Sequence, residues 1–487
     1  MDMVMDHYEI FVGGQWVRST GTERIEVVSP FTEEVIGSVP SGTTADVDRA
    51  VAAARAALES DPWSSMTLDD RLVMLRRLSQ LLAAAREELA ALVTAEMGCP
   101  ITQSRTIQAV NPVRILDAYI DVAKEYPFRS LRTDLTTALV TRRPVGVVAG
   151  IVPWNVPASL VLQKVAPALA TGCTVVLKPA PETPFDAYLI ARLLEEAGCP
   201  PGVVNIVPAD RDVSEYLVRH RGVDKVTFTG SSAAGRRIAE LCGADLRRVT
   251  LELGGKSAGI VLEDADLDAT VGGLRLGMFR NNGQVCSLKT RLLVPENLEA
   301  EVLDRLRALV ASLPVGDPSD PDTHIGPLVS ARQRDRVEGY IRAGVDQGAT
   351  LVVGGGRPAD QPTGWFVEPT VFARVDPDSV IAQEEIFGPV LSVTTYRDEE
   401  HAVAIANNSD YGLSGAVYTS DIERGVRVGS RIRTGTVEIN GSPAGFFAPM
   451  GGVRSSGIGR EFGPEGLDSF VELQTIGLPR DATHSLS

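Results

Sequence analysis

Between Pro144 and Ile260 the chain alternates short apolar runs with helix-like segments, and no other feature of the sequence constrains its fold as strongly. Val145–Ile151 and Cys173–Leu177 are apolar almost throughout, as strands buried on both faces are. Val156–Ala170, between them, has the length and pattern of a helix. Strands that alternate with helices predict a doubly wound parallel sheet of the α/β class.

The same alternation predicts the other elements of this region. Further strands are expected at Val203–Val207, Val226–Thr229, Val249–Leu253 and Ser257–Val261. Further helices are expected up to Ala197, at Val213–Arg219 and up to Leu241.

A second α/β series begins past Asp266, as expected for a chain of 487 residues, because one core rarely grows beyond about 250–300 residues. Helices are expected at Leu267–Phe279, Leu298–Leu313 and Ala331–Gly348, and strands at Leu351–Val353, Trp365–Val371 and Val390–Thr395. Between the N-terminal region and the first series, Tyr126–Pro144 alternates polar and apolar residues, which predicts exposed strands outside a compact core.

The first hundred residues predict mostly helix. Gly13-Gly14 follows an apolar run and predicts a short hairpin. Val47–Leu58 is expected to be helical, and Asp69–Met97 is expected to form one long amphipathic helix closed by Gly98. At the other end, the last ten or so residues are expected to fray.

Composition excludes several classes of function. A net charge of −16 leaves no basic surface for a nucleic acid. The five cysteines are scattered without a CxxC pair, so neither a disulfide framework nor a metal site is expected. No apolar run approaches the roughly 18 residues that a membrane-spanning helix needs, and no basic-then-apolar signal follows the acidic N-terminus. A soluble, cytoplasmic protein is therefore expected.

Two segments have the character of anion or nucleotide sites. Phe228–Arg236 runs from a strand through Gly230 and Ser231 into a helix, whose N-terminal N–H groups can bind an anion. It is neither a GxGxxG nor a Walker loop, so a capped helix is an equally good interpretation. Lys178 follows a predicted strand, where parallel sheets bind ligands, although a solvated lysine is the simpler alternative.

Three residues have the chemistry of a catalytic site. Glu252 lies in an apolar strand, where a carboxylate gains a raised pKa and can act as a base, unless it pairs with Lys256 or an arginine. Cys286 follows a glycine-containing turn and could be a nucleophile, although burial in a core is commoner. Asn155, in a loop fixed by two prolines, could donate to an oxyanion.

In this order the segments resemble the aldehyde dehydrogenase superfamily, from Phe11–Gly14 to Ser456–Glu461. The resemblance implies that Cys286 is the nucleophile, Glu252 the base that activates water, and Asn155 the side chain that stabilises the oxyanion with the Cys286 N–H. It implies oxidation of an aldehyde to an acid through a hemithioacetal and a thioester, with NAD(P) as the hydride acceptor.

The resemblance also implies a set of cofactor contacts. These are Val152, Pro153, Trp154, Lys178, Gly230, Ser231, Gly235, Leu253, Gly254, Glu385 and Phe387. Among them, Gly230, Ser231 and Gly235 meet the pyrophosphate, Lys178 binds the adenosine ribose, Glu385 binds the nicotinamide ribose, and Phe387 packs by the nicotinamide. NAD-preferring members often carry a glutamate where this chain has Pro181, so NAD is expected and NADP remains open.

The implied architecture has three parts. Residues 1–125 and 145–254 would bind NAD(P), residues 255–454 would form the catalytic domain, and residues 126–144 with 455–487 would form an oligomerisation element. That element implies a homodimer or homotetramer. Two other departures from the family pattern are Leu288 and Met450; with Val285, Met450 indicates an apolar, adaptable substrate entry without naming a substrate.

Three alternatives remain. In a CoA-acylating dehydrogenase, CoA would resolve the thioester, and Glu252 argues against it because that branch lacks the base. In a catalytically retired structural protein, Cys286, Glu252 and Asn155 would not be expected together. An esterase activity of Cys286 would share the acyl-enzyme step.

Overall fold

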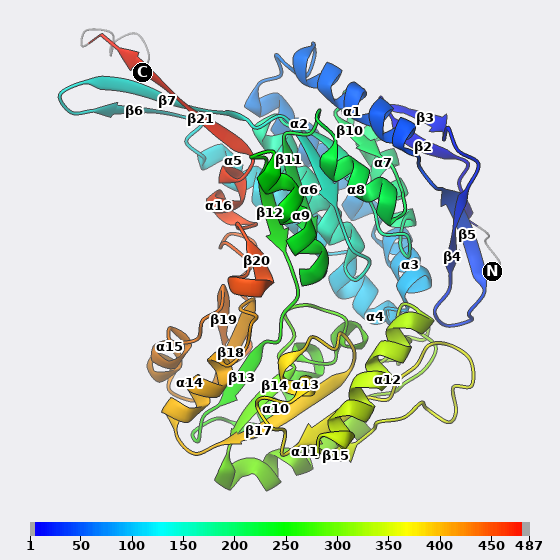
Figure 1. Cartoon of the computed structure of the whole chain (residues 1–487), viewed down its shortest axis with the longest axis vertical. Helices are drawn as coiled ribbons and strands as arrows, with labels where there is room; N and C mark the ends of the chain where they lie inside the picture. The colour runs from blue at the N-terminus through cyan, green and yellow to red at the C-terminus, as the bar shows by residue number, and fades with distance from the viewer. Residues whose placement is uncertain (1–4, 480–487) are drawn as a thin grey trace.

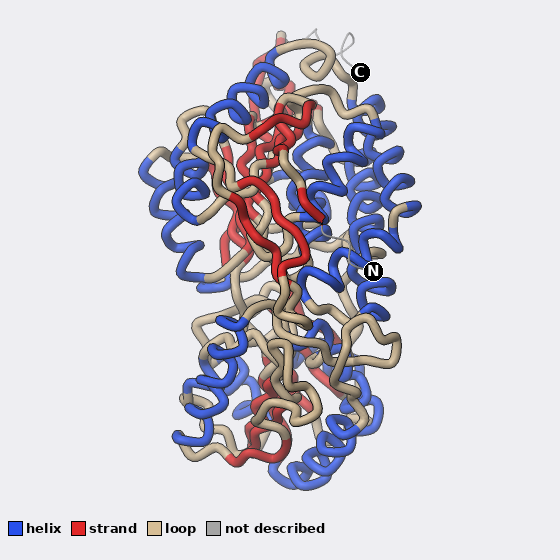
Figure 2. The backbone as a smooth tube through the Cα atoms, turned by 90° about the vertical axis from the view of Figure 1, so that its right-hand side faces the viewer, coloured by secondary structure: helices blue, strands red, loops and turns tan. Residues whose placement is uncertain are grey.

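The computed structural model describes residues 5–479, which form two stacked lobes and an extended arm (Figure 1). The side view separates the two lobes clearly, each with strands inside and helices outside (Figure 2). In the upper lobe lies an eight-stranded sheet, in the lower lobe a seven-stranded sheet, and in the arm a three-stranded sheet.

The upper sheet has the order β20-β12-β11-β8-β9-β10-β2-β3. Its strands are β2 (Glu9–Val12), β3 (Gln15–Arg18), β8 (Val147–Ile151), β9 (Thr174–Lys178), β10 (Val204–Ile206), β11 (Lys225–Thr229), β12 (Arg248–Glu252) and β20 (Gly457–Ile458). The five central strands are parallel, and the chain moves from β8 outward to β10, then returns to β11 beside β8. This confirms the predicted doubly wound fold.

Helices cover both faces of this sheet. They are α1 (Thr44–Glu59), α2 (Leu68–Ala84), α3 (Arg86–Met97), α4 (Ile101–Gln103), the π-helix η1 (Ser104–Gln108), α5 (Asn111–Glu125), α6 (Pro157–Thr171), α7 (Phe185–Ala197), α8 (Arg211–Arg219) and α9 (Ser232–Ala244). Residues of β8 alternate between two cores: Val148 packs with α5, α6 and α7, whereas Val147 and Ala149 pack with α1, α8 and α9. Because successive side chains of a strand point to opposite faces of the sheet, one strand packs against both helical layers.

The lower sheet has the order β15-β16-β17-β14-β13-β18-β19. Its strands are β13 (Ala258–Val261), β14 (Arg291–Pro295), β15 (Thr350–Val353), β16 (Thr370–Ala373), β17 (Val390–Tyr396), β18 (Ser414–Tyr418) and β19 (Thr436–Ile439). Around it lie α10 (Leu267–Gly277), η2 (Arg280–Gly283), η3 (Glu296–Leu298), α11 (Glu299–Ala311), α12 (Ala331–Asp346), α13 (Val380–Gln383), α14 (Glu399–Asn407) and α15 (Ile422–Gly429). All pairs are parallel except β15 with β16.

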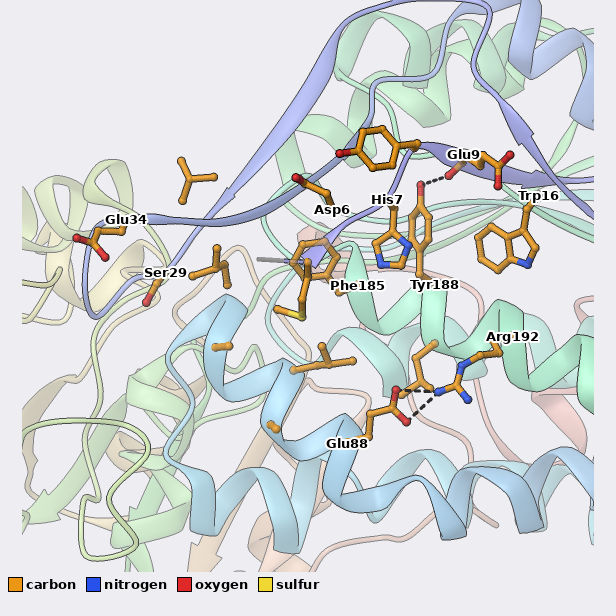
Figure 3. A pocket seen from close by; sticks show the side chains of 18 of the residues that line it. Asp6, His7, Glu9, Trp16, Ser29, Glu34, Glu88, Phe185, Tyr188 and Arg192 are labelled. Carbon is orange, nitrogen blue, oxygen red and sulfur yellow. Dashed lines mark hydrogen bonds and ion pairs between the residues drawn. The ribbon is translucent and has the colours of Figure 1, made fainter. Parts of the chain in front are cut away.

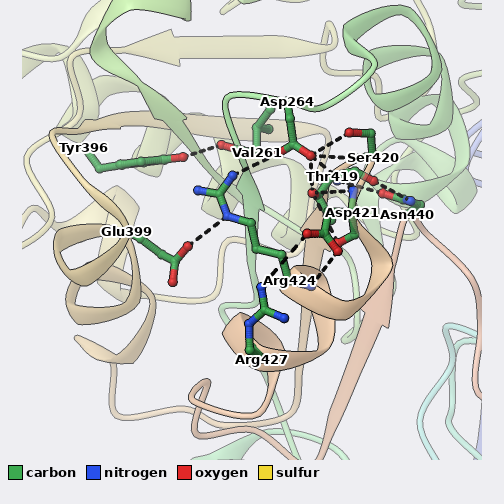
Figure 4. Close-up of polar contacts among 10 residues, drawn as sticks. All are labelled: Val261, Asp264, Tyr396, Glu399, Thr419, Ser420, Asp421, Arg424, Arg427 and Asn440. Atoms are coloured by element: carbon green, nitrogen blue, oxygen red, sulfur yellow. Dashed lines mark hydrogen bonds and ion pairs between the residues drawn. The ribbon is translucent and has the colours of Figure 1, made fainter.

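A polar cluster around Asp264 ties the end of β13 to the start of α15 (Figure 4). One Asp264 oxygen accepts from the Thr419 hydroxyl at 2.7 Å, and from the Ser420 N–H and hydroxyl at 3.0 and 2.7 Å. Its other oxygen lies 3.3 Å from the Arg424 guanidinium. Although burial opposes it, this hydrogen bonding holds the pKa of Asp264 at about 2.

The arm consists of β6 (Arg129–Thr133), β7 (Thr137–Pro144) and β21 (Val471–Leu478), paired antiparallel. It projects from the upper lobe (Figure 1), and Leu131, Leu473 and Ile476 on it are exposed. The strands predicted at Tyr126–Pro144 are therefore present. Three elements lie elsewhere. The turn η4 (Arg454–Ser456) is hydrogen-bonded to Leu253 and Asp410, and α16 (Gly463–Asp468) leads into the arm. A small sheet consists of β1 (Met5–Asp6), β4 (Arg24–Val28) and β5 (Val35–Pro40).

Some predictions of secondary structure were wrong. The single helix predicted at Asp69–Met97 is two helices, because Ala85 (φ −88°, ψ 11°) leaves the helical conformation. The halves then pack on different partners, α2 on α5 and α3 on η1. Of the strand predicted at Trp365–Val371, only the end belongs to β16. Strands β14, β18 and β19 were not predicted, and the predicted terminal tail lies largely outside the described residues.

No helix within residues 5–479 has both the length and the apolar character needed to cross a membrane. Within the same residues, no group of three or more His, Cys, Asp or Glu side chains could hold a metal ion.

Candidate active site

The order of strands in the upper sheet reverses between β8 and β11. These two strands are neighbours, although the chain passes through β9 and β10 between them. In doubly wound sheets, ligands bind beyond the carboxyl ends of the strands at such a point. Ile151 of β8 is in register with Phe228 of β11 and with Lys178 of β9, and Thr229 is in register with Glu252 of β12. The loops that begin at Val152, Gly230 and Leu253 therefore leave the sheet at nearly one level.

The turn before Cys286 is built from two asparagines in left-handed backbone conformation. Asn281 and Asn282 have φ values of 52° and 59°, in a region that asparagine tolerates better than most residues. The buried Asn282 amide donates to the Gly98 carbonyl at 2.9 Å and to the Pro327 carbonyl at 2.8 Å. The turn is thus anchored to both lobes and fixes the backbone that leads to Cys286.

Asn155 contacts this turn from the upper lobe. Its Nδ2 donates to the Gln284 carbonyl at 3.0 Å, while its own carbonyl accepts from Asn281 Nδ2 at 2.8 Å. Gln108 also donates to the Asn155 carbonyl, at 3.2 Å. Asn155 is therefore held beside the cysteine loop by three hydrogen bonds.

Glu252 ends β12 with a buried carboxylate, 3% exposed, and neither oxygen has a hydrogen-bond partner among the described residues. Burial and the nearby Glu461 raise the pKa of Glu252 well above its usual range, against the opposing charges of Lys164 and Arg460. The alternative of a pairing with Lys256 is excluded, because the buried Lys256 ammonium also has no hydrogen-bond partner. An unpaired, buried carboxylate with a raised pKa has the character of a general base.

Cys286 and Glu252 line one cavity of about 140 Å³. Burial raises the pKa of the Cys286 thiol to about 12, and the charges of Glu385 and Glu252 add to this, while Arg280 opposes it. The cavity wall is mostly apolar and includes Ile107, Ile115, Val156, Leu160, Val285, Phe446 and Met450. A thiol and a buried carboxylate thus line one cavity whose surface is mostly apolar.

The side of the cleft predicted for the nicotinamide holds Trp154, Phe387 and Glu385. The Trp154 and Phe387 rings meet edge to face with centroids 5.4 Å apart, and Phe387 has a φ of 61°, a strained value for a bulky residue. Glu385 Oε1 accepts from the Gly255 N–H at 3.0 Å. A Cβ on Gly254 would lie 2.2 Å from Glu385 Oε2, so only glycine admits the carboxylate here.

The side predicted for adenosine and pyrophosphate is formed by the N-terminus of α9 and by Lys178. Ser231 caps α9 and accepts from the Ala234 N–H at 3.3 Å. Gly235 lets α9 approach Leu253, since a Cβ there would lie 2.5 Å from the leucine side chain. Burial lowers the pKa of Lys178 to about 8, despite the carboxylates of Glu182 and Asp210. These features fit a dinucleotide laid across the strand ends.

Several residues of the site were not found from the sequence. Lys164 of α6 forms a buried ion pair with Glu461. Glu461 also lies close enough to Glu252 to raise the pKa of the Glu252 carboxyl group. A lysine inside an apolar helix was a signal that could have identified Lys164. Arg280, on the wall of the same cavity, carried no such signal, because it directly follows the helix predicted at Leu267–Phe279. Among the other cysteines, Cys99, Cys173 and Cys242 are buried and Cys199 is half-buried.

A second hollow in the described surface is larger than this cavity. It has about 1200 Å³ and lies between the N-terminal strands and helices α3 and α7, where His7, Phe185, Tyr188 and Trp16 form its aromatic wall (Figure 3). On the facing side, Glu88 and Arg192 neutralise each other through contacts of 2.7 and 2.8 Å (Figure 3). It contains no cysteine and no unpaired cation among its lining residues.

The sequence profile of the aldehyde dehydrogenase family matches residues 16–476. Among curated proteins, a geranial dehydrogenase from Castellaniella defragrans is 48% identical over 98% of this chain and 100% of that protein. A 3-succinoylsemialdehyde-pyridine dehydrogenase from a Pseudomonas species is 43% identical over 97% of this chain and 98% of that protein.

Solved structures resemble the chain equally closely. An aldehyde dehydrogenase of Mycobacterium tuberculosis in complex with NAD⁺ has a TM-score of 0.97 and 44% identity, covering 99% of this chain and all of that chain. A mutant of aldehyde dehydrogenase C from Pseudomonas syringae, in complex with NAD⁺ and octanal, has a TM-score of 0.95 and 40% identity, covering 99% of this chain and all of that chain.

Proposed function

The chain belongs to the aldehyde dehydrogenase family, and on that premise we propose that Cys286 is the nucleophile that attacks the substrate carbonyl. The protein oxidises aldehydes with NAD as the oxidant. The single observation that supports the choice of residue most is that Cys286 and Glu252 line one cavity, to which no other described cysteine except Cys99 contributes. Cys99 is fully buried, whereas Cys286 is partly exposed.

The oxyanion that forms on attack is bound by the Asn155 amide and the Cys286 N–H. Support comes from the contact between Asn155 and the Gln284 carbonyl, which fixes the amide beside the nucleophile. Because these donors are in place before the substrate arrives, they need no reorganisation when negative charge develops. The product of this step is a hemithioacetal on Cys286.

NAD would be held by the residues at the strand ends. Val152, Pro153 and Trp154 follow β8, Lys178 ends β9, Gly230, Ser231 and Gly235 belong to the turn and first part of α9, Leu253 and Gly254 follow β12, and Glu385 and Phe387 face them from the lower lobe. When bound, NAD supplies the hydride acceptor that turns the hemithioacetal into a thioester.

Glu252 then takes a proton from the water that attacks the thioester, and the acid and the Cys286 thiol are released. Its buried and unpaired carboxylate supports this role, since no structural ion pair competes for its charge. The presence of this base argues against a CoA-acylating enzyme, in which CoA replaces water. It argues equally against a retired structural protein, in which a buried unpaired carboxylate would only destabilise the fold.

NAD is the proposed cofactor rather than NADP, although Pro181 replaces the glutamate often found in NAD-preferring members. Glu182 and Asp210 lie close enough to Lys178 to raise its pKa against burial. Two carboxylates beside the adenosine ribose site disfavour the extra phosphate of NADP through charge repulsion.

The domain division, the assembly and the location are also proposals. We propose a cofactor domain of residues 1–125 and 145–254, a catalytic domain of residues 255–454, and an oligomerisation element of residues 126–144 and 455–487, from which β20 pairs into the cofactor sheet. The exposed leucines of the arm support a homodimer or homotetramer. Five free cysteines support a reducing compartment, the cytoplasm.

The experiment that tests the function measures absorbance at 340 nm with aliphatic and aromatic aldehydes, in parallel with NAD and NADP and without CoA. Reduction of NAD is expected with aldehydes that carry an apolar chain. Reduction only after CoA is added would favour the acylating enzyme, and aldehyde-independent ester hydrolysis as the sole activity would favour an esterase.

A further inference from the structure

A positively charged side chain lines the cavity that contains Cys286. Arg280 follows the fully buried Phe279 and opens the turn η2, six residues before the cysteine. Its neighbour Asn281 donates its backbone N–H to Gln103 Oε1 at 2.7 Å, so the backbone at the base of the side chain is fixed. The guanidinium is close enough to Cys286 for its charge to lower the pKa of the thiol.

The Arg280 guanidinium forms no ion pair among the residues that the structure describes. Glu438 is the carboxylate that most affects its pKa, but Glu438 pairs instead with Lys289 at 2.9 Å. The contrast with Arg291 is informative, because that buried guanidinium donates to the carbonyls of Lys256, Ile405 and Ala406 at 2.8–3.0 Å. The N–H groups of Arg291 are used in structural hydrogen bonds, whereas those of the Arg280 guanidinium remain available to a ligand.

The rest of the cavity wall defines what a ligand of Arg280 must look like. Apart from Glu252 at the catalytic end, the other wall residues are uncharged, and the surface that they expose to the cavity is mostly apolar, although polar side chains such as Gln103 and Gln163 also line it. Arg280 remains protonated at neutral pH even though burial lowers its pKa. A largely apolar chain therefore suits this cavity, and Arg280 offers it a partner for a group that accepts a charge-assisted hydrogen bond.

From this arrangement, and resting on the proposed role of Cys286, we infer that Arg280 is a specificity-determining residue that binds a carboxylate on the substrate. The substrate class is then the oxo-carboxylic acids, in which an aliphatic chain joins the aldehyde to a terminal carboxylate. A guanidinium is suited to this partner because its parallel N–H groups match both carboxylate oxygens. Arg280 thereby selects substrates that carry a carboxylate, in a cavity whose surface is otherwise mostly apolar.

The test compares matched pairs of substrates that differ only in the terminal carboxylate: hexanal with adipic semialdehyde, and butanal with succinic semialdehyde. Wild-type enzyme is expected to have a kcat/KM about 10- to 100-fold higher for the oxo-acid of at least one pair. Arg280→Met should abolish this ratio through the KM of the oxo-acid, and Arg280→Lys should keep most of it. Arg427→Met, which removes an exposed positive charge on α15, is the control for net charge.

The ratio separates substrate binding from an effect on the nucleophile. Loss of the Arg280 charge raises the pKa of the Cys286 thiol, which slows both members of a pair equally and leaves their ratio unchanged. If Arg280→Met changes both rates alike, the arginine acts only on the thiol and the inference is overturned.

A measurement on wild-type enzyme alone keeps the inference testable should the variants fold poorly. Adipate is expected to compete with hexanal at least about 10-fold more strongly than hexanoate does. Equal inhibition by the two acids, or equal kcat/KM values within both substrate pairs, would refute the assignment. Turnover of no aldehyde at all would instead contradict the proposed function.

Discussion

Asn155 donates from Nδ2 to the Gln284 carbonyl at 3.0 Å, which ties the upper lobe to the backbone two residues before Cys286. The carbonyl of Asn155 also accepts from Asn281, so the contact is reciprocal. The distance between the proposed oxyanion donor and the nucleophile is therefore set by two hydrogen bonds before any substrate binds.

Replacement of Asn155 by alanine is expected to lower kcat about 100- to 1000-fold, because one oxyanion donor is lost while the backbone carbonyl that binds Asn281 remains. Stopped-flow measurement of the first turnover should show that thioester formation is the slowed step. Alkylation of Cys286 by iodoacetamide serves as the control, since the thiol should react at a nearly unchanged rate. A first turnover as fast as that of wild-type enzyme would remove Asn155 from the oxyanion site.

Glu252→Gln is expected to uncouple the two halves of the reaction. The variant should reduce one equivalent of NAD in a burst and then stall, because the thioester on Cys286 lacks the base that activates water. Mass spectrometry of the quenched enzyme should detect the acyl group on Cys286, and Cys286→Ala should show neither burst nor adduct. In wild-type enzyme, deacylation should accelerate as the pH rises, since burial and Glu461 raise the pKa of Glu252. Normal steady-state turnover in the glutamine variant would mean that the base is another group.

The resting thiol of Cys286 is expected to be protonated at neutral pH. Burial and two neighbouring carboxylates raise its pKa to about 12, so the thiolate fraction of the cofactor-free enzyme should keep growing throughout the alkaline range. The rate of alkylation, located on Cys286 by peptide mapping, should increase about tenfold per pH unit without reaching a plateau below about pH 10. A plateau near neutral pH would show that the free enzyme already stabilises the thiolate.

Charge repulsion at the adenosine end is expected to set the cofactor preference. Glu182→Gln should reduce the preference for NAD over NADP by about tenfold, since one of the two carboxylates near Lys178 is neutralised. The comparison is the ratio of kcat/KM for the two cofactors, with Glu196→Gln as a control on the exposed surface of α7. If the ratio does not move, the preference comes from shape around Pro181 rather than from charge.

The Asp264 cluster is expected to stabilise the lower lobe in a pH-dependent way. Its folded-state pKa of about 2 lies below the ordinary value of 3.8, so its contribution is complete above about pH 4 and is lost as the pH falls through about 2. Asp264→Asn should lower the free energy of unfolding by about 1–2 kcal/mol at pH 7, after allowance for partial exposure. Urea unfolding at pH 7 and near pH 3 should show the difference shrinking; a difference independent of pH would attribute it to hydrogen bonding alone.

The parts of the fold that the sequence predicted correctly are those with strong local periodicity. The strands β8 to β12 and their helices follow from apolar runs and helical spacing, and the candidate residues Cys286, Glu252 and Asn155 follow from the resemblance. The break at Ala85 was missed because both halves keep the same apolar spacing, and only tertiary packing separates them. Strands β18 and β19 lie in a stretch where glycines and polar residues interrupt the pattern, so no local signal marks them.

The side chains that tune the site were the least predictable, because their effect depends on contacts between distant segments. Glu461 acts on Glu252 only after the chain returns to the upper lobe, and Arg280 joins Glu252 on the cavity wall only in the folded chain. Neither relationship can be deduced from spacing along the chain.

The pairing of β20 with β12 means that synthesis and folding cannot proceed lobe by lobe. The upper sheet has β3 at one border, made within the first twenty residues, and β20 at the other, made at Gly457–Ile458. A ribosome must therefore translate the whole lower lobe before the last strand of the upper sheet exists. Until then β12, which ends at Glu252, is an unpaired edge strand of the nascent chain. A chaperone that shields this edge would act just before the proposed base Glu252 is enclosed.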